Sequence, residues 1–519
     1  MSLKYGPACG KIGRYLRTPR DLPGRYYTLR HFSLDRWRGR IGSASMAKTA
    51  LLVTRDSSGL KDFSKRLVEE FGFRLRVVNS VVPDEIVQAE TVEMGRAMEL
   101  VKAGEVSLLV ANFFDVSSVG RDFMSWKSAL KAFDHEIVDL IRTAARRPQD
   151  TTVLGSPNGY GEILALLAEG KGALSGRFRL DQACNALHAA SEFDASVAQF
   201  LETQGGDTPD IDALSGYPKS IRFVWKRAHC LKEGESPRQK AALYGSFGEH
   251  FEKVAGPELD YGSILDLSLA VYTIGEFEKT TAAIIQNGSL ISAASADSVE
   301  QAVERARMAF EGMLSNATLV VNGSVDADLL DSLSDGIFAS VLAPVFVSGA
   351  VSDGLRLLES REGLGYDALQ EVRSVVGGVL VQDRNRVPVN PFAWRMPSAN
   401  QPLVTQWEDM IFGVKLSRHL RSSACLAVIG ERVVAQASDL IDQSGVWERL
   451  RQMGESIEGA TLVFDVDIED PEAIDRAKSA GVGVLVHPGI DAARERLLVE
   501  RANAVGLALV ATGVSLRKL

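Results

Sequence analysis

The chain has 519 residues, of which 45% are apolar and 24% are charged, and its formal net charge is −9. This length predicts two to four domains, and this composition is typical of a soluble globular protein. No apolar run reaches the roughly 20 residues that cross a bilayer, and an acidic chain does not favour nucleic acid as a partner.

Basic residues dominate the first 46 positions. Residues 1–45 carry ten Lys and Arg side chains but only two acids. The segment could be a basic docking arm, an Arg-rich transit peptide, or an upstream extension of a chain whose natural start is Met46. We favour the extension, because the first strand signal begins immediately afterwards, at Lys48. We therefore set residues 1–46 apart as a basic N-terminal extension.

Residues 47–202 alternate between strand and helix patterns. TALLVT at 49–54 is an apolar run that is typical of a buried parallel strand, and similar runs follow at 107–112 and 151–154. Asp56 stands at an N-cap position before a helix with apolar residues at helical spacing. Further helices are expected at about 136–147 and 180–202. This alternation predicts a doubly wound α/β domain.

A segment rich in Gly, Asp, Pro and Ser follows, and we interpret residues 203–219 as a linker. The α/β pattern then returns over 220–519. Six apolar runs in this region predict further buried strands: 282–285, 317–321, 376–381, 462–464, 482–486 and 507–510.

Motif spacing alone does not identify a reaction. The four cysteines are scattered, and the seven histidines have no metal-ligand spacing, so neither a disulfide framework nor a metal site is expected. This cysteine usage favours the reducing cytoplasm. The glycine-rich run Gly155–Gly161 could hold an anion on backbone N–H groups, but it lacks the ending of a P-loop, and we favour a tight turn into a helix.

Five stretches carry a resemblance to a known family. They are ALLVTRDSSGL at 50–60, SLLVANF at 107–113, IRTAA at 141–145, KEGESPRQ at 232–239 and GGVLVQD at 377–383. In this order and at these intervals, the chain from about residue 47 to its end resembles the bifunctional purine-biosynthesis enzymes AICAR transformylase/IMP cyclohydrolase.

The resemblance implies an architecture and an activity. It implies a methylglyoxal-synthase-like domain over 47–202, which closes the purine ring in the family. It implies two cytidine-deaminase-like subdomains over 220–519, which transfer a formyl group from 10-formyl-tetrahydrofolate. It also implies a homodimer that shares its transformylase sites between subunits.

Nine residues match positions that the family uses to bind nucleotides: Asn112, Asp134, Arg142, Lys232, Gly234, Glu235, Gln239, Gln382 and Asp383. For Arg142 we favour a helix-surface charge over a role in binding. Lys232 and Glu233 replace the family's Arg-Tyr pair, and a carboxylate at that position would repel a phosphate.

The largest departure lies at the family's catalytic Lys-His pair. Gln286 and Asn287 stand there, and neither side chain titrates near neutral pH, so neither can serve as a general acid or base. The glycine-rich phosphate loop is replaced by VVNSV at 77–81, which wraps a phosphate less readily. Ser423, Ser515 and the folate-side segment 465–470 also depart from the family.

Three other residues are candidates for catalysis: His487, His419 and Lys415. Lys415 and His419 lie four positions apart on one predicted helix face. His487 stands where the family has Gln, so it could be a gained titratable group, but we favour a solvent-facing loop histidine. Convergence of the three on one pocket would favour a repurposed enzyme, and their dispersal would favour a non-catalytic protein.

Three functions remain open from the sequence. The first is a non-catalytic or regulatory relative in which both ancestral sites have decayed. The second is a repurposed formyltransferase-type enzyme that acts on a nucleotide-like substrate. The third is a working purine enzyme with displaced residues. We favour the first, because two separate sites have lost residues together.

Overall fold

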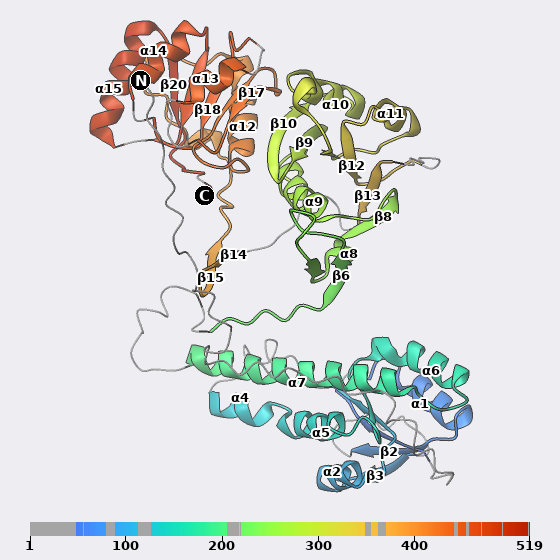
Figure 1. Cartoon of the computed structure of the whole chain (residues 1–519). Helices are drawn as coiled ribbons and strands as arrows, with labels where there is room; N and C mark the ends of the chain where they lie inside the picture. The colour runs from blue at the N-terminus through green and yellow to red at the C-terminus, as the bar shows by residue number, and fades with distance from the viewer. Residues whose placement is uncertain are drawn as a thin grey trace, which may run out of the picture. The chain divides into compact units, whose positions relative to one another are not determined.

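A computed structural model describes residues 48–55, 57–78, 89–112, 126–204, 217, 220–347, 354–361, 370–440, 445–452, 456–468, 470–489, 491–516 and 518. The chain forms two compact units, one ending at Val224 and the other beginning at Trp225 (Figure 1). Among these described residues no helix is long and apolar enough to span a membrane.

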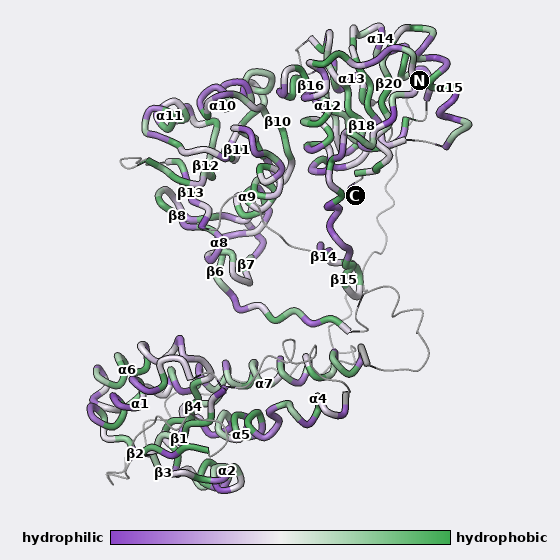
Figure 2. The backbone as a smooth tube through the Cα atoms, turned by 180° about the vertical axis from the view of Figure 1, so that it is seen from behind, coloured by the Kyte–Doolittle hydropathy of each residue, from purple (hydrophilic) through white to green (hydrophobic). Residues whose placement is uncertain are grey.

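The N-terminal unit contains a five-stranded parallel sheet in the order β3-β2-β1-β4-β5. Its strands are β1 (Thr49–Val53), β2 (Arg74–Val78), β3 (Ala89–Val92), β4 (Leu108–Ala111) and β5 (Thr152–Leu154). All residues of β1, β4 and β5 are buried, because helices cover both faces. The apolar runs follow these central strands in Figure 2.

Each face of this sheet has its own core. α1 (Leu60–Glu69) and α6 (Tyr160–Glu169) cover one face, where the rings of Phe63 and Tyr160 stack 4.2 Å apart. α2 (Met94–Ala103), α5 (His135–Ala145) and α7 (Gly176–Gln204) cover the other. Short α4 (Trp126–Ala132) and the 3-10 turn η2 (Pro157–Gly159) also belong to the unit. The predicted α/β architecture is confirmed.

The first half of the C-terminal unit is a mixed six-stranded sheet in the order β10-β9-β11-β12-β13-β8. Its strands are β8 (Phe251–Ala255), β9 (Thr281–Gln286), β10 (Ser289–Ser295), β11 (Ala317–Val321), β12 (Phe338–Ala343) and β13 (Arg356–Ser360). Its helices are α8 (Phe247–His250), α9 (Tyr261–Ile274), α10 (Val299–Met308), η4 (Glu311–Met313) and α11 (Ala327–Ser332).

The second half repeats this succession with a sheet in the order β17-β16-β18-β19-β20. Its strands are β16 (Cys425–Val428), β17 (Val433–Ala437), β18 (Thr461–Phe464), β19 (Val484–His487) and β20 (Ala508–Ala511). Its helices are η5 (Pro391–Ala393), α12 (Val404–Ser417), α13 (Gly445–Gln452), α14 (Glu472–Ser479) and α15 (Ala492–Val505). In both halves a helix precedes an antiparallel hairpin, and two parallel pairs follow.

Edge strands β10 and β17 join the two halves. Ala294 and Arg432 form an antiparallel bridge, and Gln436 Nε2 donates to Leu290 O at 3.2 Å. One continuous hydrophobic core runs from Leu267 in the first half to Leu509 in the second. The two halves therefore pack as one body.

Two hairpins of the C-terminal unit project away from the core. They are β6 (Arg227–Leu231) with β7 (Ala241–Tyr244), and β14 (Gln370–Val375) with β15 (Gly378–Asp383). The prediction of a buried strand at 376–381 is wrong, because Val376 and Gly377 form an exposed turn and Leu380 is 63% exposed. Of the expected linker 203–219, the first two residues belong to α7, and most of the remainder lies outside the described residues.

Candidate functional site

Gln286 and Asn287, which the resemblance assigns to the family's catalytic Lys-His pair, lie at a tight hairpin turn. Asn287 and Gly288 join β9 to β10 with φ angles of 53° and 69°. Two residues in left-handed conformation suit a type I′ turn, for which Asn-Gly is a preferred pair. The buried carboxylate of Asp266 on α9 lies beneath the turn and accepts a hydrogen bond from Gly288 N at 2.5 Å.

Gln286 is also part of this scaffold. Its Oε1 accepts a hydrogen bond from Ser315 N at 2.9 Å, which ties the end of β9 to the loop before β11. The sequence analysis missed the hairpin, although Asn-Gly between two apolar runs was a visible signal. The side chains of Gln286 and Asn287 at the turn are both amides.

A cavity of about 510 Å³ borders the turn. Five segments line it: residues 288–290, Glu371 with Arg373 on β14, 419–421 after α12, 438–439 after β17, and Lys518. We refer to it as the turn cavity. Glu371 accepts hydrogen bonds from Arg373 Nη2 and Gln382 Nε2, both at 3.1 Å. The predicted site residue Gln382 therefore contacts the wall of this cavity.

His419 and Lys415 meet around one residue of the first half. Lys415 Nζ donates to Glu276 O at 2.7 Å, and His419 Nε2 lies 3.5 Å from Glu276 Oε1. His419 lines the turn cavity, whereas the Lys415 ammonium is held at the Glu276 carbonyl, 5.3 Å from the centre of the Phe277 ring. Lys415 thus ties α12 to the first half.

Burial sets the protonation of this group. Burial lowers the pKa of His419, although the neighbouring Glu276 carboxylate acts against that effect. Burial alone would raise the pKa of Glu276, but His419, Arg418 and Lys415 outweigh it and lower this pKa. These directions favour a neutral His419 imidazole at the cavity wall and an ionised Glu276 carboxylate 3.5 Å from it.

His487 lies apart from this pair. It ends β19 and is fully buried, so the expectation of a solvent-facing loop histidine is wrong. Neither of its ring nitrogens has a hydrogen-bond partner in the described part of the chain. Burial lowers the pKa of His487 to about 4. The turn cavity is lined by His419 but not by His487 or Lys415. The three candidate residues therefore do not converge on this cavity.

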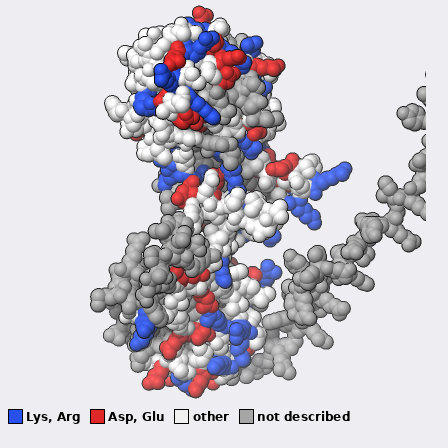
Figure 3. All heavy atoms as spheres, turned by 90° about the vertical axis from the view of Figure 1, so that its left-hand side faces the viewer, with Lys and Arg blue, Asp and Glu red and all other residues white. Residues whose placement is uncertain are grey.

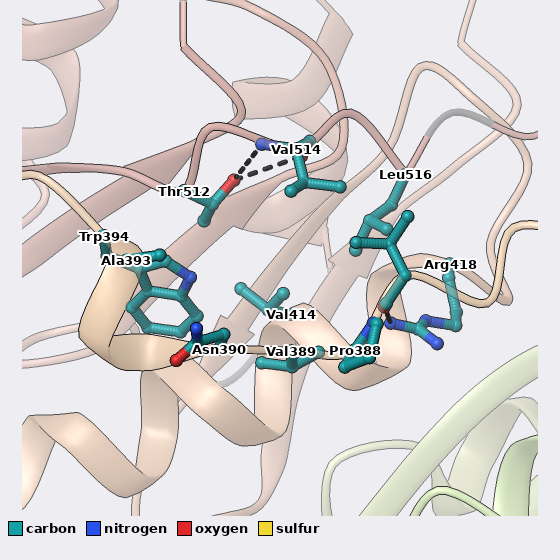
Figure 4. Close-up of a pocket in the computed structure, with 11 residues that line it drawn as sticks. Pro388, Val389, Asn390, Ala393, Trp394, Val414, Arg418, Thr512, Val514 and Leu516 are labelled. Carbon is teal, nitrogen blue, oxygen red and sulfur yellow. Dashed lines mark hydrogen bonds between the residues drawn. The ribbon is translucent and has the colours of Figure 1, made fainter.

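A second cavity of about 330 Å³ lies in the second half, between the segment 387–394, α12 and the segment 512–516 (Figure 4). Its walls are mostly apolar, with Trp394 and Val414 prominent in the close-up. Its polar side chains bond to other parts of the fold. Thr512 Oγ1 donates to Val514 O and accepts from Val514 N, and Arg418 Nη2 donates to Val387 O.

The N-terminal unit brings two predicted site residues together at the carboxyl edge of its sheet. Arg55 N donates to Asn112 Oδ1 at 2.7 Å, and the Arg55 guanidinium donates to the Asp134 carboxylate through Nη2 at 2.6 Å and Nε at 3.1 Å. The Asp134 side chain is only 4% exposed. The sequence analysis missed Arg55, which engages the Asp134 carboxylate.

Arg142 lies away from that edge. Its guanidinium bonds Asp139 within α5 at 2.8 Å and also pairs with Asp194 on α7. It therefore fastens α5 to α7. Of the segment 77–81 that replaces the family's phosphate loop, Val77 and Val78 end β2, and 79–81 lie outside the described residues.

The remaining predicted binding residues lie on the two projecting hairpins. Gly234 and Gln239 close the loop between β6 and β7, where Gly234 N donates to Gln239 O at 2.9 Å. Lys232 and Glu235 are exposed on the same loop, and Asp383 is exposed at the end of β15. None of these five residues lines the turn cavity.

Two residues of the segment expected on the folate side belong to the internal structure of the fold. Asp465 is buried, and its carboxylate accepts hydrogen bonds from Ala424 N and the Ser422 hydroxyl. Ile468 belongs to the hydrophobic core. These two side chains hold the fold together and are not available to bind 10-formyl-tetrahydrofolate.

The described residues contain no cluster of His, Cys, Asp and Glu side chains that could hold a metal ion. Acidic and basic side chains are interspersed on the face of the molecule in Figure 3.

Comparisons with known proteins identify relatives over most of the chain. The model of the family described as "AICARFT/IMPCHase bienzyme" matches residues 144–438. A bifunctional purine biosynthesis protein PurH from Chloroflexus aurantiacus is 30% identical over 79% of this chain and 80% of its own length. The PurH protein of a Cyanothece species is 26% identical over 90% of this chain and 99% of its own length.

Two further matches are weaker. The PurH protein of Bacillus subtilis is 23% identical over 79% of this chain and 80% of its own length. A solved structure described as "Crystal structure of ForH" is 18% identical over 30% of this chain and 99% of its own, with a TM-score of 0.26. That likeness is too low to support any argument about this chain.

Proposed function

Since this chain belongs to the AICARFT/IMPCHase bienzyme family, we propose that it is a diverged member that binds a nucleotide-like ligand and catalyses neither formyl transfer nor ring closure. The relatives are named as bifunctional purine biosynthesis proteins, and the likeness covers both of their halves. The proposal concerns which of the relatives' binding and catalytic properties this chain retains.

One observation carries the proposal. The residues aligned with the catalytic Lys-His pair form the end of a strand and a type I′ turn, with Asn287 in left-handed conformation and Gly288 bonded to a buried carboxylate. A formyl transfer needs a proton acceptor for the attacking amine, and an amide cannot supply one at neutral pH. Loss of a general acid or base costs roughly 10²- to 10⁴-fold in rate.

The cyclohydrolase half supports the same conclusion. Asp134 is retained, but the Arg55 guanidinium occupies it through two nitrogen atoms. A carboxylate engaged in a bidentate pair is a poor acceptor for a ligand hydrogen bond, since the ligand would have to displace a charge-assisted contact. This half is therefore proposed to be structural.

A repurposed enzyme is the second candidate, and His419 is the observation that favours it. Its imidazole lines the turn cavity and is neutral because burial lowers its pKa. A neutral imidazole can accept a proton from a bound substrate. We rank this candidate second because His487 and Lys415 do not join His419 at the cavity.

We also propose a cytoplasmic homodimer, as in the family. The β14–β15 hairpin exposes apolar side chains, with Val376 fully exposed and Leu380 63% exposed. A hairpin without a partner is marginal in water, and a second copy of the chain would bury these side chains. A Leu380→Asp variant should shift the mass measured by light scattering towards the monomer, and an unchanged dimer would contradict this interface.

The decisive experiment is a formyl-transfer assay. The purified protein is incubated with AICAR and 10-formyl-tetrahydrofolate, and the Bacillus subtilis PurH protein serves as the positive control. We expect a rate at least roughly 100-fold below the control, because the general acid–base pair is absent. A rate within tenfold of the control would overturn the proposal.

A thermal-shift series with AICAR and IMP then tests binding separately from turnover. A ligand at about 100 times its Kd should add about 2.7 kcal/mol to the free energy of unfolding. Binding without turnover supports the non-catalytic protein. Turnover that is lost in a His419→Gln variant supports the repurposed enzyme.

A further inference from the structure

A third cavity, of about 290 Å³, lies beside α9 in the first half of the C-terminal unit. Six side chains that carry a ring line it: Trp225, Tyr244, Phe247, His250, Phe251 and Tyr272. They come from the residue range before β6, from β7, from α8 and β8, and from α9. We refer to it as the ring cavity. None of the described residues that line it also lines the turn cavity, so the two are separate sites.

The chemistry of the lining favours a neutral ligand. Among the described residues that line the ring cavity there is no carboxylate, ammonium or guanidinium group. A charged ligand would lose hydration there without gaining an ionic partner. The Ser268 hydroxyl in the lining donates to Ile264 O within α9 at 2.7 Å, so towards a ligand its oxygen can serve as an acceptor. A ligand that suits this wall therefore carries a hydrogen-bond donor.

The size and the rings of the cavity suit a fused aromatic ligand. An apolar cavity of roughly 150 Å³ holds a benzene ring, and the ring cavity has about twice that volume. Two of its rings remain largely in solvent, since Trp225 is 60% exposed and Tyr244 is 53% exposed. Aromatic rings contribute most when they are buried against another ring in an offset or edge-to-face arrangement. A planar ligand in the cavity would bury both of these rings.

The second half has a cavity on the same face of the equivalent helix. Asp266 on α9 and Asp409 on α12 each accept a hydrogen bond from the turn of the following hairpin. Val271 and Val414 each stand five positions after that carboxylate, and each lines a cavity. The ring cavity therefore corresponds to the cavity of Figure 4, and the two can be compared position by position.

In the second half the chain itself supplies a stacked pair of rings at this place. Trp407, two positions before Asp409 on α12, stacks on Trp394 with ring centres 6.2 Å apart and planes 8° from parallel. Trp394 lines that cavity and is only 7% exposed. In the first half the position equivalent to Trp407 is Ile264. The first half thus has aromatic walls but lacks the ring that Trp407 provides in the second.

We infer that the ring cavity binds a neutral, planar ligand of two fused rings that carries an N–H donor. The ligand stacks on Tyr244 and Trp225 and donates a hydrogen bond to Ser268 Oγ. It takes the part in the first half that the ring of Trp407 takes in the second. This inference goes beyond the proposed function and does not depend on it, because the turn cavity and the N-terminal unit have no part in it.

The test titrates the full chain with indole as the probe and follows binding by saturation-transfer NMR. Tyr244→Ala removes a stacking ring, and Ile264→Trp fills the cavity with the side chain that the second half has at the equivalent position. The matched control is Phe392→Ala on η5 of the same unit, where the ring is fully exposed. We expect Tyr244→Ala to weaken indole binding roughly 10-fold, Ile264→Trp to weaken it further, and Phe392→Ala to leave it within twofold.

Two further probes test the class of ligand. Benzofuran keeps the fused rings but has an oxygen in place of the N–H group, so it should bind the parent chain roughly 3- to 10-fold more weakly than indole. In a Ser268→Ala variant this difference should disappear. Equal binding of indole and benzofuran to the parent would overturn the hydrogen bond to Ser268. Cyclohexanol binding as tightly as indole would overturn the aromatic class.

Thermal midpoints and light scattering complete the test. Ile264→Trp should unfold at or above the midpoint of the parent chain, and if it unfolds below, Tyr244→Ala decides the question. Absence of indole binding to the parent would overturn the inference, and so would an equal loss in Phe392→Ala. If the parent binds no indole and Tyr244→Ala shifts the mass towards the monomer, a second copy of the chain covers the ring cavity and the inference falls.

Discussion

The two halves of the C-terminal unit build the same hairpin over the same kind of carboxylate, yet they use the space around it differently. In the first half Asp266 accepts from Gly288 N, and in the second half Asp409 accepts from Glu431 N, with 22 positions between partners in both. The first turn borders the turn cavity. The second turn is covered by Arg305, which donates to Gly430 O, and by Lys279, which pairs with Glu431.

This difference separates scaffold from site. A feature that occurs in both halves, the carboxylate under the turn, belongs to the fold. The features found beside one turn only, the cavity and the basic residues Arg421 and Lys518 in its lining, are where a function specific to this chain should be sought. Gln286 and Asn287, the positions that the resemblance assigns to the family's catalytic pair, belong here to the scaffold.

The largest expected effect concerns a buried histidine that only the second half contains. By strand register His487 takes the place of Ala343 in the first half. Its folded pKa of about 4 lies below the ordinary value of 6.5, so the unfolded chain binds the proton first. Stability should therefore be lost as the pH falls from about 6.5 to about 4, by roughly 3 kcal/mol in total.

A His487→Leu variant should remove this pH dependence. The measurement is the difference in unfolding free energy between variant and parent, from denaturant titrations at pH 7 and pH 4. His229→Gln, at an exposed strand position of the same unit, is the matched control and should leave the dependence unchanged. An equal pH dependence in the parent and in His487→Leu would contradict the assignment of this acid sensitivity to His487 in the second half.

The paired carboxylates give the next effect. Asp266→Ala and Asp409→Ala should each cost about 1–3 kcal/mol, because each leaves a turn N–H without its acceptor. Asp266→Asn and Asp409→Asn should cost less, since the amide oxygen still accepts and burial raises the pKa of both carboxyls. Denaturant titration measures all four. A cost confined to one half would break the equivalence of the two turns.

The smallest effect concerns the turn residues. Asn287 and Glu431 both have positive φ, at 53° and 56°, and Asn tolerates this conformation better than Ala or Glu. Asn287→Ala should cost about 1 kcal/mol, whereas Glu431→Asn should gain up to about 0.5 kcal/mol despite losing its surface pair with Lys279. Thermal unfolding of the two variants checks the opposite signs, and equal signs would contradict this account.

The sequence predicted the strands that are buried on both faces. TALLV in β1 and ATLVV in β11 lie where their apolar runs indicated, because a strand covered on both sides is apolar at every position. It failed at the β14–β15 hairpin, which is equally apolar at Val379–Val381 but stands exposed. Local sequence does not reveal whether an apolar strand is covered by its own chain.

The site was less accessible to prediction. The resemblance directed attention to Gln286 and Asn287 as a catalytic position, and this hid the hairpin that their Asn-Gly signal predicts. Arg55 and Lys518 could not be found from motifs, since each depends on a tertiary partner: Asp134 for Arg55, and the arginines of three segments for Lys518. His419 was one of the candidates from the sequence and lines the turn cavity, but its neighbour Glu276 belongs to the other half and could not be paired with it from the sequence.

The antiparallel meeting of β10 with β17 has a consequence for how this unit can be taken apart. Each strand is the last of its own sheet, and each shields the open hydrogen-bonding side of the other. A half produced alone would expose that side as a template for intermolecular pairing. Expression of either half by itself should therefore yield aggregates, and co-expression of the two should restore a soluble complex.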